Sequence, residues 1–248
     1  EIPSSVTSIG GYVFYDCGSL TSIEIPNSVT SIGHGAFGRC SSLTSIDIPS
    51  SVTSIGDRAF YNCSSLTSID IPSSVTSIGD TAFSSCSNLT SIEIPSSVTS
   101  IGDKAFYKCI SLTGINVDEN NQNYCSEDGV LFNKDKTELI RYPSKKADKQ
   151  YVIPNSVTSI GDTAFSSCSN LTSIEIPSSV TSIGGYAFYW CRSLTSIEIS
   201  NSITSIGASA FSSCSKLTTI NYHGTEEQFK EIKIGSGNDY FKNATVNY

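Results

Sequence analysis

The sequence predicts a repeat solenoid in which 23-residue coils stack into parallel β-sheets joined by short helical turns. A cysteine, a phenylalanine and an Ile-Pro pair each recur every 23 residues within two runs of the chain. The cysteine column is Cys17, Cys40, Cys63, Cys86 and Cys109, followed by Cys168, Cys191 and Cys214. A period of roughly 20–50 residues indicates a solenoid, because each unit buries its apolar face only by stacking on its neighbours.

The main strand of each coil is predicted where apolar and polar residues alternate. In the third coil this alternation is Ile69-Asp70-Ile71, which predicts a strand over 68–71 with Asp70 facing outward. Pro72 ends this strand, since proline has no N–H for the sheet ladder.

The rest of the coil predicts a second short strand over 52–55, closed by Gly56, and a helical turn over 57–63. This turn places Phe60 inside the coil. The predicted inward set is Ile48, Val52, Ile55, Ala59, Phe60, Cys63, Leu66 and Ile69. We expect neighbouring coils to stack about 4.7–4.9 Å apart.

The segment 116–151 departs from the period and predicts a β-hairpin, with strands over 127–132 and 137–142 around a turn at 133–136. It carries six of the fifteen basic residues: Lys134, Lys136, Arg141, Lys145, Lys146 and Lys149. These residues either protect an exposed hairpin edge from aggregation or form a basic patch for a partner.

The segment 221–248 predicts a C-terminal cap. Thr225-Glu-Glu-Gln228 is a capping box at a helix start. Phe229 and Ile232 are expected to face the last coil, and 245–248 is expected to add a final strand. The first coil has no such cap, so we expect it to expose its apolar side and the chain to be part of a longer array.

The chain is therefore expected to form one solenoid domain over 1–248. Five repeats occupy 1–115, the irregular hairpin unit 116–151, three repeats 152–220 and the cap 221–248.

The repeat resembles the BspA-like (Treponema-type) leucine-rich repeats. The matching residues are Cys40, Leu43, Ile46, Ile48, Pro49, Val52, Ile55, Gly56, Ala59 and Phe60, at the spacing of that family's pattern. The resemblance implies a cell-surface, extracellular protein linked to adhesion and to binding host or neighbouring-cell proteins. Hairpin inserts and a similar C-terminal cap are also features of that family.

Composition and motifs exclude several classes. The net charge of −8 disfavours nucleic acid, whose phosphates require clustered Lys and Arg. No apolar run approaches about 18 residues, so no membrane insertion is expected. Residues 33–38 match G-x-G-x-x-G, but other coils place Arg58 and Tyr61 in its second and third glycine columns, and no βαβ unit surrounds it. His34 and His223 are the only histidines, and His34 is expected to be exposed. We expect no catalysis and no cofactor.

The cysteines are expected to be free thiols, since parallel side chains in one column have poor disulfide geometry. Cys125 lies off the column and is expected to be the most reactive thiol. No paired Cys/His spacing indicates zinc, and we expect no metal site. The stretch 118–123 faintly resembles a calcium loop but lacks glycine at its sixth position.

The proposed partner-binding residues form an outward acidic column on the main strands. Its members are Glu1, Glu24, Asp47, Asp70, Glu93, Glu175 and Glu198. Stacked like charges repel, so the column either attracts a basic partner or cations, or keeps an open sheet face soluble and unpaired.

An alternative patch is aromatic. Tyr186, Tyr189 and Trp190 share one corner, where Tyr12 and Tyr15 hold the matching columns of the first coil. Such residues suit a binding hot spot or pack partly against neighbouring coils.

The predicted function is protein–protein binding at the cell surface without catalysis. Two alternatives stay open: a carbohydrate-binding surface module that uses the aromatic corner, and a passive spacer.

Overall fold

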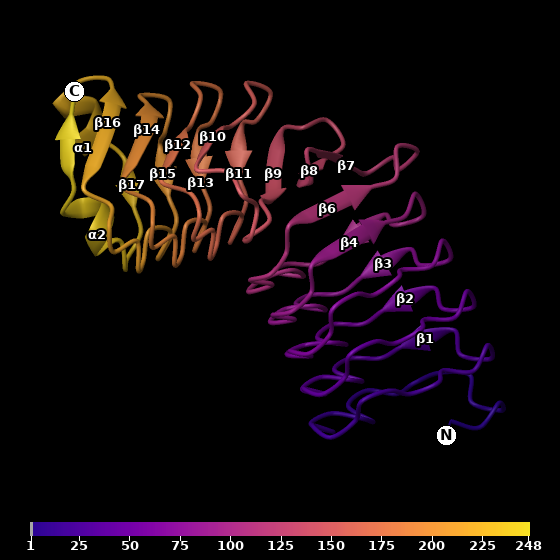
Figure 1. Ribbon diagram of the computed structural model, residues 1–248. Coiled ribbons are helices and arrows are strands. Elements are labelled where there is room, and N and C mark those ends of the chain that lie inside the picture. The colour runs from indigo at the N-terminus through magenta and orange to yellow at the C-terminus, as the bar shows by residue number, and fades with distance from the viewer. Residues whose placement is uncertain (1) are drawn as a thin grey trace. The chain divides into compact units, whose positions relative to one another are not determined.

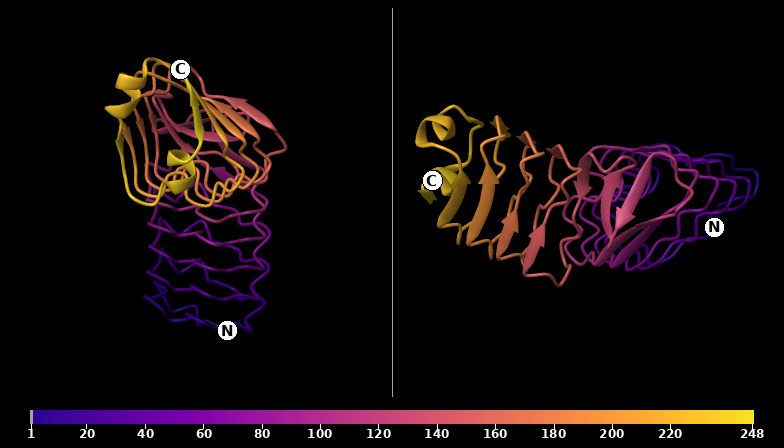
Figure 2. Two further views of the ribbon diagram at one scale, coloured as in Figure 1. Left: turned by 90° about the vertical axis from the view of Figure 1, so that its left-hand side faces the viewer. Right: turned by 90° about the horizontal axis from the view of Figure 1, so that it is seen from above.

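The computed structural model describes residues 2–248. The chain divides into two compact units, Glu1–Gly129 and Val130–Tyr248, each built of stacked coils (Figure 1). In the left view of Figure 2 the coils of the first unit follow one another as successive rungs.

In the first unit, the short strands predicted over 52–55 and its equivalents are confirmed as two-residue strands. They form a parallel sheet in the order β1 (Ser31–Ile32), β2 (Ser54–Ile55), β3 (Ser77–Ile78) and β5 (Ser100–Ile101). A second sheet pairs β4 (Ser91–Ile94) with β6 (Gly114–Val117). Strand β7 (Tyr124–Glu127) follows. The 23-residue spacing continues through Tyr124, which lies one period after Ile101.

In the second unit, one sheet contains the hairpin strands β8 (Val130–Asn133) and β9 (Glu138–Arg141), extended by the short strands of successive coils. These are β11 (Ser159–Ile160), β13 (Ser182–Ile183), β15 (Ser205–Ile206) and β17 (Lys233–Ile234). The other sheet contains β10 (Gln150–Val152), β12 (Ser173–Glu175), β14 (Ser196–Ser200), β16 (Thr219–His223) and β18 (Thr245–Asn247). The predicted solenoid is confirmed.

The core of each coil is the predicted inward set. Phe60 and Cys63 are fully buried, and Ile48 is 9% exposed. The phenylalanine rings stack from coil to coil in parallel planes, with 5.5 Å between the centroids of Phe37 and Phe60 and again between those of Phe60 and Phe83. The stack runs along each unit as a continuous apolar column.

The corner predicted as a helical turn over 57–63 is a series of hydrogen-bonded turns. Arg58 and Asn62 adopt left-handed φ angles of 54° and 58°, which keep these turns from becoming an α-helix. Alternate N–H groups bond within the turn and to the next coil: the Ala59 N–H donates to Gly56, and the Phe60 N–H donates to Ala82. The corner is therefore a third hydrogen-bonded ladder along the stack.

The many serines and threonines act as coil-to-coil donors. The Ser51 hydroxyl donates to the Val29 carbonyl at 2.6 Å, and Ser74 donates to Val52 at the same distance. The Thr53 hydroxyl donates to the Thr30 carbonyl at 3.2 Å. These bonds recur from coil to coil and account for part of the high content of serine and threonine, 48 and 22 residues.

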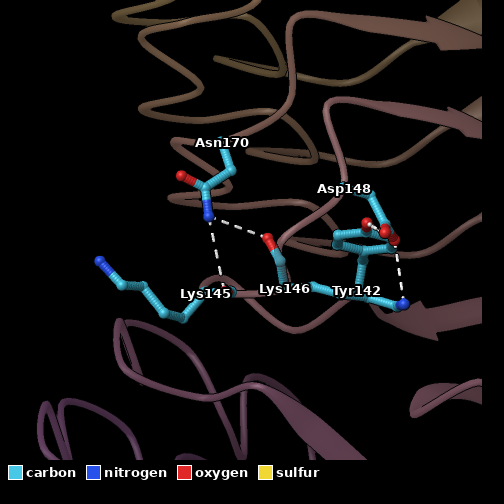
Figure 3. A network of polar contacts seen from close by, with 5 residues as sticks. All are labelled: Tyr142, Lys145, Lys146, Asp148 and Asn170. Atoms are coloured by element: carbon cyan, nitrogen blue, oxygen red, sulfur yellow. Dashed lines mark hydrogen bonds and ion pairs between the residues drawn. The ribbon is translucent and has the colours of Figure 1, made fainter.

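The hairpin is confirmed, but its first strand was placed too early. Asp128 and Gly129 form a turn with φ angles of 51° and 75°, so β8 begins at Val130 rather than at residue 127. Tyr142 then takes the place of the core phenylalanine and stacks on Phe165 at 5.1 Å. Its hydroxyl donates to Asp148 at 2.8 Å, and Asp148 also pairs with Lys146 at 2.9 Å (Figure 3).

Arg141 does not belong to a surface patch, contrary to the prediction, because it is only 3% exposed. Its guanidinium donates to the carbonyl of Ser166 at 3.1 Å and to that of Thr163 at 2.5 Å. Tyr61 holds the position equivalent to Ser166 in an ordinary coil. Its carbonyl accepts a hydrogen bond from a backbone N–H of the preceding coil, that of Arg39. The arginine side chain thus replaces a backbone donor that the hairpin coil does not supply.

The C-terminal cap is confirmed. Helix α1 (Glu226–Lys230) begins with the predicted capping box at Thr225, and β18 pairs with β16. Ile232 is buried and Phe229 is half-buried. The second helix, α2 (Asp239–Lys242), adds Phe241, whose ring continues the stack at 4.7 Å from Phe211.

Candidate functional site

The acidic column lies outward, as predicted. Glu24, Asp47, Asp70 and Glu93 in the first unit, and Glu175 and Glu198 in the second, are all exposed. Glu1 lies outside the described residues. Within the described chain, Glu24, Asp47 and Asp70 form no ion pair.

The strand predicted over 68–71 is absent, as are its equivalents over 22–25 and 45–48. Beside these segments, the threonine of each coil bonds to the preceding coil: the Thr67 N–H and hydroxyl both donate to the Thr44 carbonyl, at 3.3 and 3.4 Å. Asp47 and Asp70 each have a carboxylate on both sides along the column. Like charges facing each other across strands disfavour pairing, but they do not prevent it, because Glu175 and Glu198 face each other in the paired strands β12 and β14.

In the first unit, main-strand pairing appears where a neutral residue joins the column. Asn116 lies opposite Glu93 in the β4–β6 pair, and its side-chain amide donates to the Glu93 carboxylate at 2.7 Å. In the second unit, Glu198 lies opposite Glu175 on one side and Asn221 on the other. His223 Nε2 also lies 4.0 Å from the Glu198 carboxylate. The most concentrated uncompensated charge is therefore at Asp47 and Asp70.

The aromatic corner forms one contiguous cluster. The rings of Tyr186 and Tyr189 meet edge to face at 5.6 Å, and Tyr189 stacks on Trp190 at 5.7 Å. Trp190 and Tyr186 are each 40% exposed. The sequence interpretation missed Arg192, whose guanidinium lies 4.4 Å from the centre of the Trp190 ring. Its position two residues after Trp190 was the available signal.

The cysteine column is a hydrogen-bonded ladder of thiols. The Cys63 thiol donates to the Phe37 carbonyl at 3.1 Å, and Cys86 donates to Phe60 at the same distance. Burial is the main cause that raises the pKa of Cys63 to about 12 and that of Cys40 to about 11. No disulfide joins the cysteines within residues 2–248.

Two cysteines lie outside the buried ladder. Cys17, expected inside the first coil, is exposed, and Phe14 beside it is only half-buried. This agrees with the expectation that the first coil exposes its apolar side. Cys125 is half-buried in β7.

The calcium-loop resemblance at 118–123 is wrong. Asn121 is fully buried in the column that holds Val98 one coil earlier, and its amide donates to the Pro95 and Val98 carbonyls. Its side-chain oxygen accepts the N–H groups of Asn123 and Tyr124 at 2.8 Å, so it has no role as a metal ligand. The described residues contain no group of three His, Cys, Asp or Glu side chains arranged to hold a metal.

The glycines of the rejected G-x-G-x-x-G stretch have a packing role. A Cβ on Gly35 would lie 2.8 Å from the ring of Tyr12, and one on Gly38 would lie 2.7 Å from the ring of Tyr15. The two tyrosines of the first coil thus cover the two glycines of the second. His34 is half-exposed; its ring is tilted by 54° against that of Tyr12, with 4.9 Å between the centroids, and its Nδ1 lies 3.8 Å from the Asp57 carboxylate.

Comparison with known proteins identifies the repeat. The family model for the BspA type leucine-rich repeat region matches residues 4–128 and 144–244, in six copies. No curated protein sequence matches the chain significantly. No helix among residues 2–248 has the length and apolar character needed to cross a bilayer.

Three solved structures are similar along nearly the whole chain. A leucine-rich repeat protein from Eubacterium ventriosum is 33% identical, with a TM-score of 0.75 over 92% of this chain and 66% of its own. A leucine-rich cell surface protein from Faecalibacterium prausnitzii is 32% identical, with a TM-score of 0.67 over 94% and 80%. The pneumococcal vaccine antigen PcpA is 25% identical, with a TM-score of 0.72 over 97% and 73%.

Proposed function

The chain belongs to the BspA-type leucine-rich repeat family, and we propose that it is a non-catalytic scaffold, displayed outside the cell, that binds a protein partner. The similar proteins from Faecalibacterium, a cell surface protein, and from the pneumococcus, a vaccine antigen, support the proposed location. Repeat stacks of this kind offer extended surfaces built from identical columns.

The acidic column carries the proposal. Its carboxylates repeat once per coil, and at that spacing each neighbouring pair costs about 1–3 kcal/mol before salt screening. Asp47 and Asp70 are exposed, flanked by acids on both sides, and lie where the sheet ladder is missing. A partner with a basic surface relieves this repulsion and is steered to the column electrostatically.

The partner class is a basic surface or matrix protein of a host or a neighbouring cell. In the first unit, Asn116 partly compensates the charge of Glu93; in the second unit, His223 lies beside the Glu198 carboxylate. We therefore place the centre of the contact on Asp47, Asp70 and Glu93 in the first unit.

The test replaces Asp47, Asp70 and Glu93 together by serine. We expect the triple variant to be slightly more stable and to bind a lysine-rich peptide and epithelial cell surfaces more weakly, with a smaller loss of binding as salt rises. Serine replacements of Glu119, Asp135 and Glu231, which are exposed elsewhere, change the net charge equally and serve as the control. A triple variant that is no more stable and adheres as well as the parent would refute the proposal.

The aromatic corner is the second candidate for the protein contact. Trp190 and Tyr186 are exposed in one cluster with Arg192, the residue types that dominate binding hot spots. If adhesion survives loss of the acidic column but is lost on Trp190→Ser, the contact lies at this corner.

A further inference from the structure

The turn corners of the first unit form a groove that the acidic column does not touch. It has a volume of about 550 Å³ and runs across five successive coils, from Tyr12 and Tyr15 to Tyr107 and Lys108. Every residue that lines it belongs to the turns, and none belongs to the strands.

Large and small side chains alternate along one column of this groove. The column reads Tyr15, Gly38, Tyr61, Ser84 and Tyr107, so an aromatic ring recurs at every second coil. The Tyr15 ring leans over Gly38, as the 2.7 Å approach to its Cβ position shows. Ser84 lies between Tyr61 and Tyr107 in this column; it lines the groove but is itself only 2% exposed.

The two flanking columns supply positive charge. Arg39, Arg58, Lys104 and Lys108 all line the groove, in a protein whose net charge is −8. Arg39 lies 5.8 Å from the centre of the Tyr15 ring, and Lys108 lies 5.3 Å from that of Tyr107. Stacking of this kind holds a cation beside an aromatic ring.

In the turn that holds Arg58 and Tyr61, no backbone N–H group is available to an extended peptide. The N–H groups of 58–63 are all used: those of Arg58, Phe60 and Asn62 bond to the next coil, and those of Ala59, Tyr61 and Cys63 bond within the turn. A peptide strand therefore gains no main-chain ladder here, although such a ladder is its usual source of affinity. Recognition rests on rings, cations and hydroxyls.

We propose that this groove binds a linear acidic polysaccharide, whose sugar rings lie on the tyrosines and whose carboxylate or sulfate groups pair with the arginines and lysines. The negative face of an aromatic ring attracts the C–H groups that a sugar ring presents. Coils advance by about 4.8 Å, so tyrosine rings two coils apart are spaced to contact an extended polysaccharide once per disaccharide. Its charge is opposite to that of the acidic column, so the two sites are separable by experiment.

The experiment measures binding of the full chain to chondroitin sulfate oligosaccharides, to hyaluronan and to polyglutamate by calorimetry at two salt concentrations. Substitutions are taken from the same columns of other coils, so that the fold tolerates them. The aromatic variant is Tyr61→Ser with Tyr107→Ser, because Ser84 holds the same column in the coil between them. The charge variant is Arg58→Thr with Lys104→Thr, because Thr81 holds the same column and has the same left-handed φ. Lys134→Ser with Lys136→Ser on the hairpin is the matched charge control.

We expect the charge variant to lose about tenfold or more in affinity and to show a weaker salt dependence. The aromatic variant should lose about tenfold with its salt dependence unchanged. Hyaluronan binding compared with chondroitin sulfate binding shows whether carboxylates alone suffice. Equal binding of polyglutamate with no effect of the aromatic variant, or an equal loss in the hairpin control, would overturn the proposal. Self-association abolished by the Asp47, Asp70 and Glu93 serine variant would instead assign the groove to a second copy of this chain.

Discussion

Replacing Phe60 by alanine tests the stacked aromatic core most directly. Phe60 is fully buried, and its ring lies 5.5 Å from those of Phe37 and Phe83. Removing a buried phenylalanine costs about 3–5 kcal/mol, and each lost ring pair adds about 0.5–1.5 kcal/mol. We therefore expect a loss of about 4–8 kcal/mol in the free energy of unfolding, because both flanking coils lose their aromatic neighbour.

The assay is urea unfolding followed by circular dichroism, with a thermal scan in which each kcal/mol lowers Tm by about 2–4 °C. Tyr61→Ala is the control, because Tyr61 is half-buried in a column that also accepts serine, and surface changes stay near 0.5 kcal/mol, roughly. Equal losses for the two variants, or a loss below about 2 kcal/mol for Phe60→Ala, would show that the ring column does not carry the stack.

Three further predictions concern the thiols and the cap. Thiol titration of the denatured protein without reductant should find all nine cysteines reduced, and in the native protein Cys17 should react first because it is exposed. The pKa of Cys63 rises from 9.0 to about 12 on folding, so the folded state keeps a proton that the unfolded state releases. The free energy of unfolding should therefore fall as pH rises from about 9 to 12. In urea melts at several pH values, Cys63→Ala should reduce the slope of this free energy against pH by the contribution of one proton. Asn238→Ala should cost about 1–3 kcal/mol per buried group left unsatisfied, since its side chain accepts the Phe211 N–H at 2.9 Å and donates to the Gly207 and Gly235 carbonyls; amide exchange confined to the last coil would show the effect, and an unchanged melting curve would contradict it.

The columns were predictable because a strict period fixes which residues face inward. Val52, Phe60, Cys63 and Leu66 are all fully buried, as the repeat indicated. The same reasoning predicted the hairpin and the capping box, since both depend on local signals within a few residues.

The missed features depend on neighbours in space rather than in sequence. The strand over 68–71 has the right alternation, but no strand ladder forms there. Arg141 looks like a surface cation in the sequence, yet a shortened coil leaves carbonyls at Thr163 and Ser166 that its side chain serves. Phe241 continues the ring stack from a helix whose spacing breaks the period.

Two identical segments show why function in this chain belongs to the stack and not to the repeat unit. Residues 74–102 and 156–184 match at every position, yet Thr81 lies half-exposed in the groove of the first unit while its copy Thr163 is 3% exposed. The difference comes from the preceding coil: one contributes Arg58 and Tyr61, the other the buried guanidinium of Arg141. Copying a repeat therefore preserves its core residues. Whether the copied surface residues line a groove or are buried depends on the coils beside the copy. Surface substitutions that change one coil should consequently alter binding at the adjacent coils while leaving the ring stack intact.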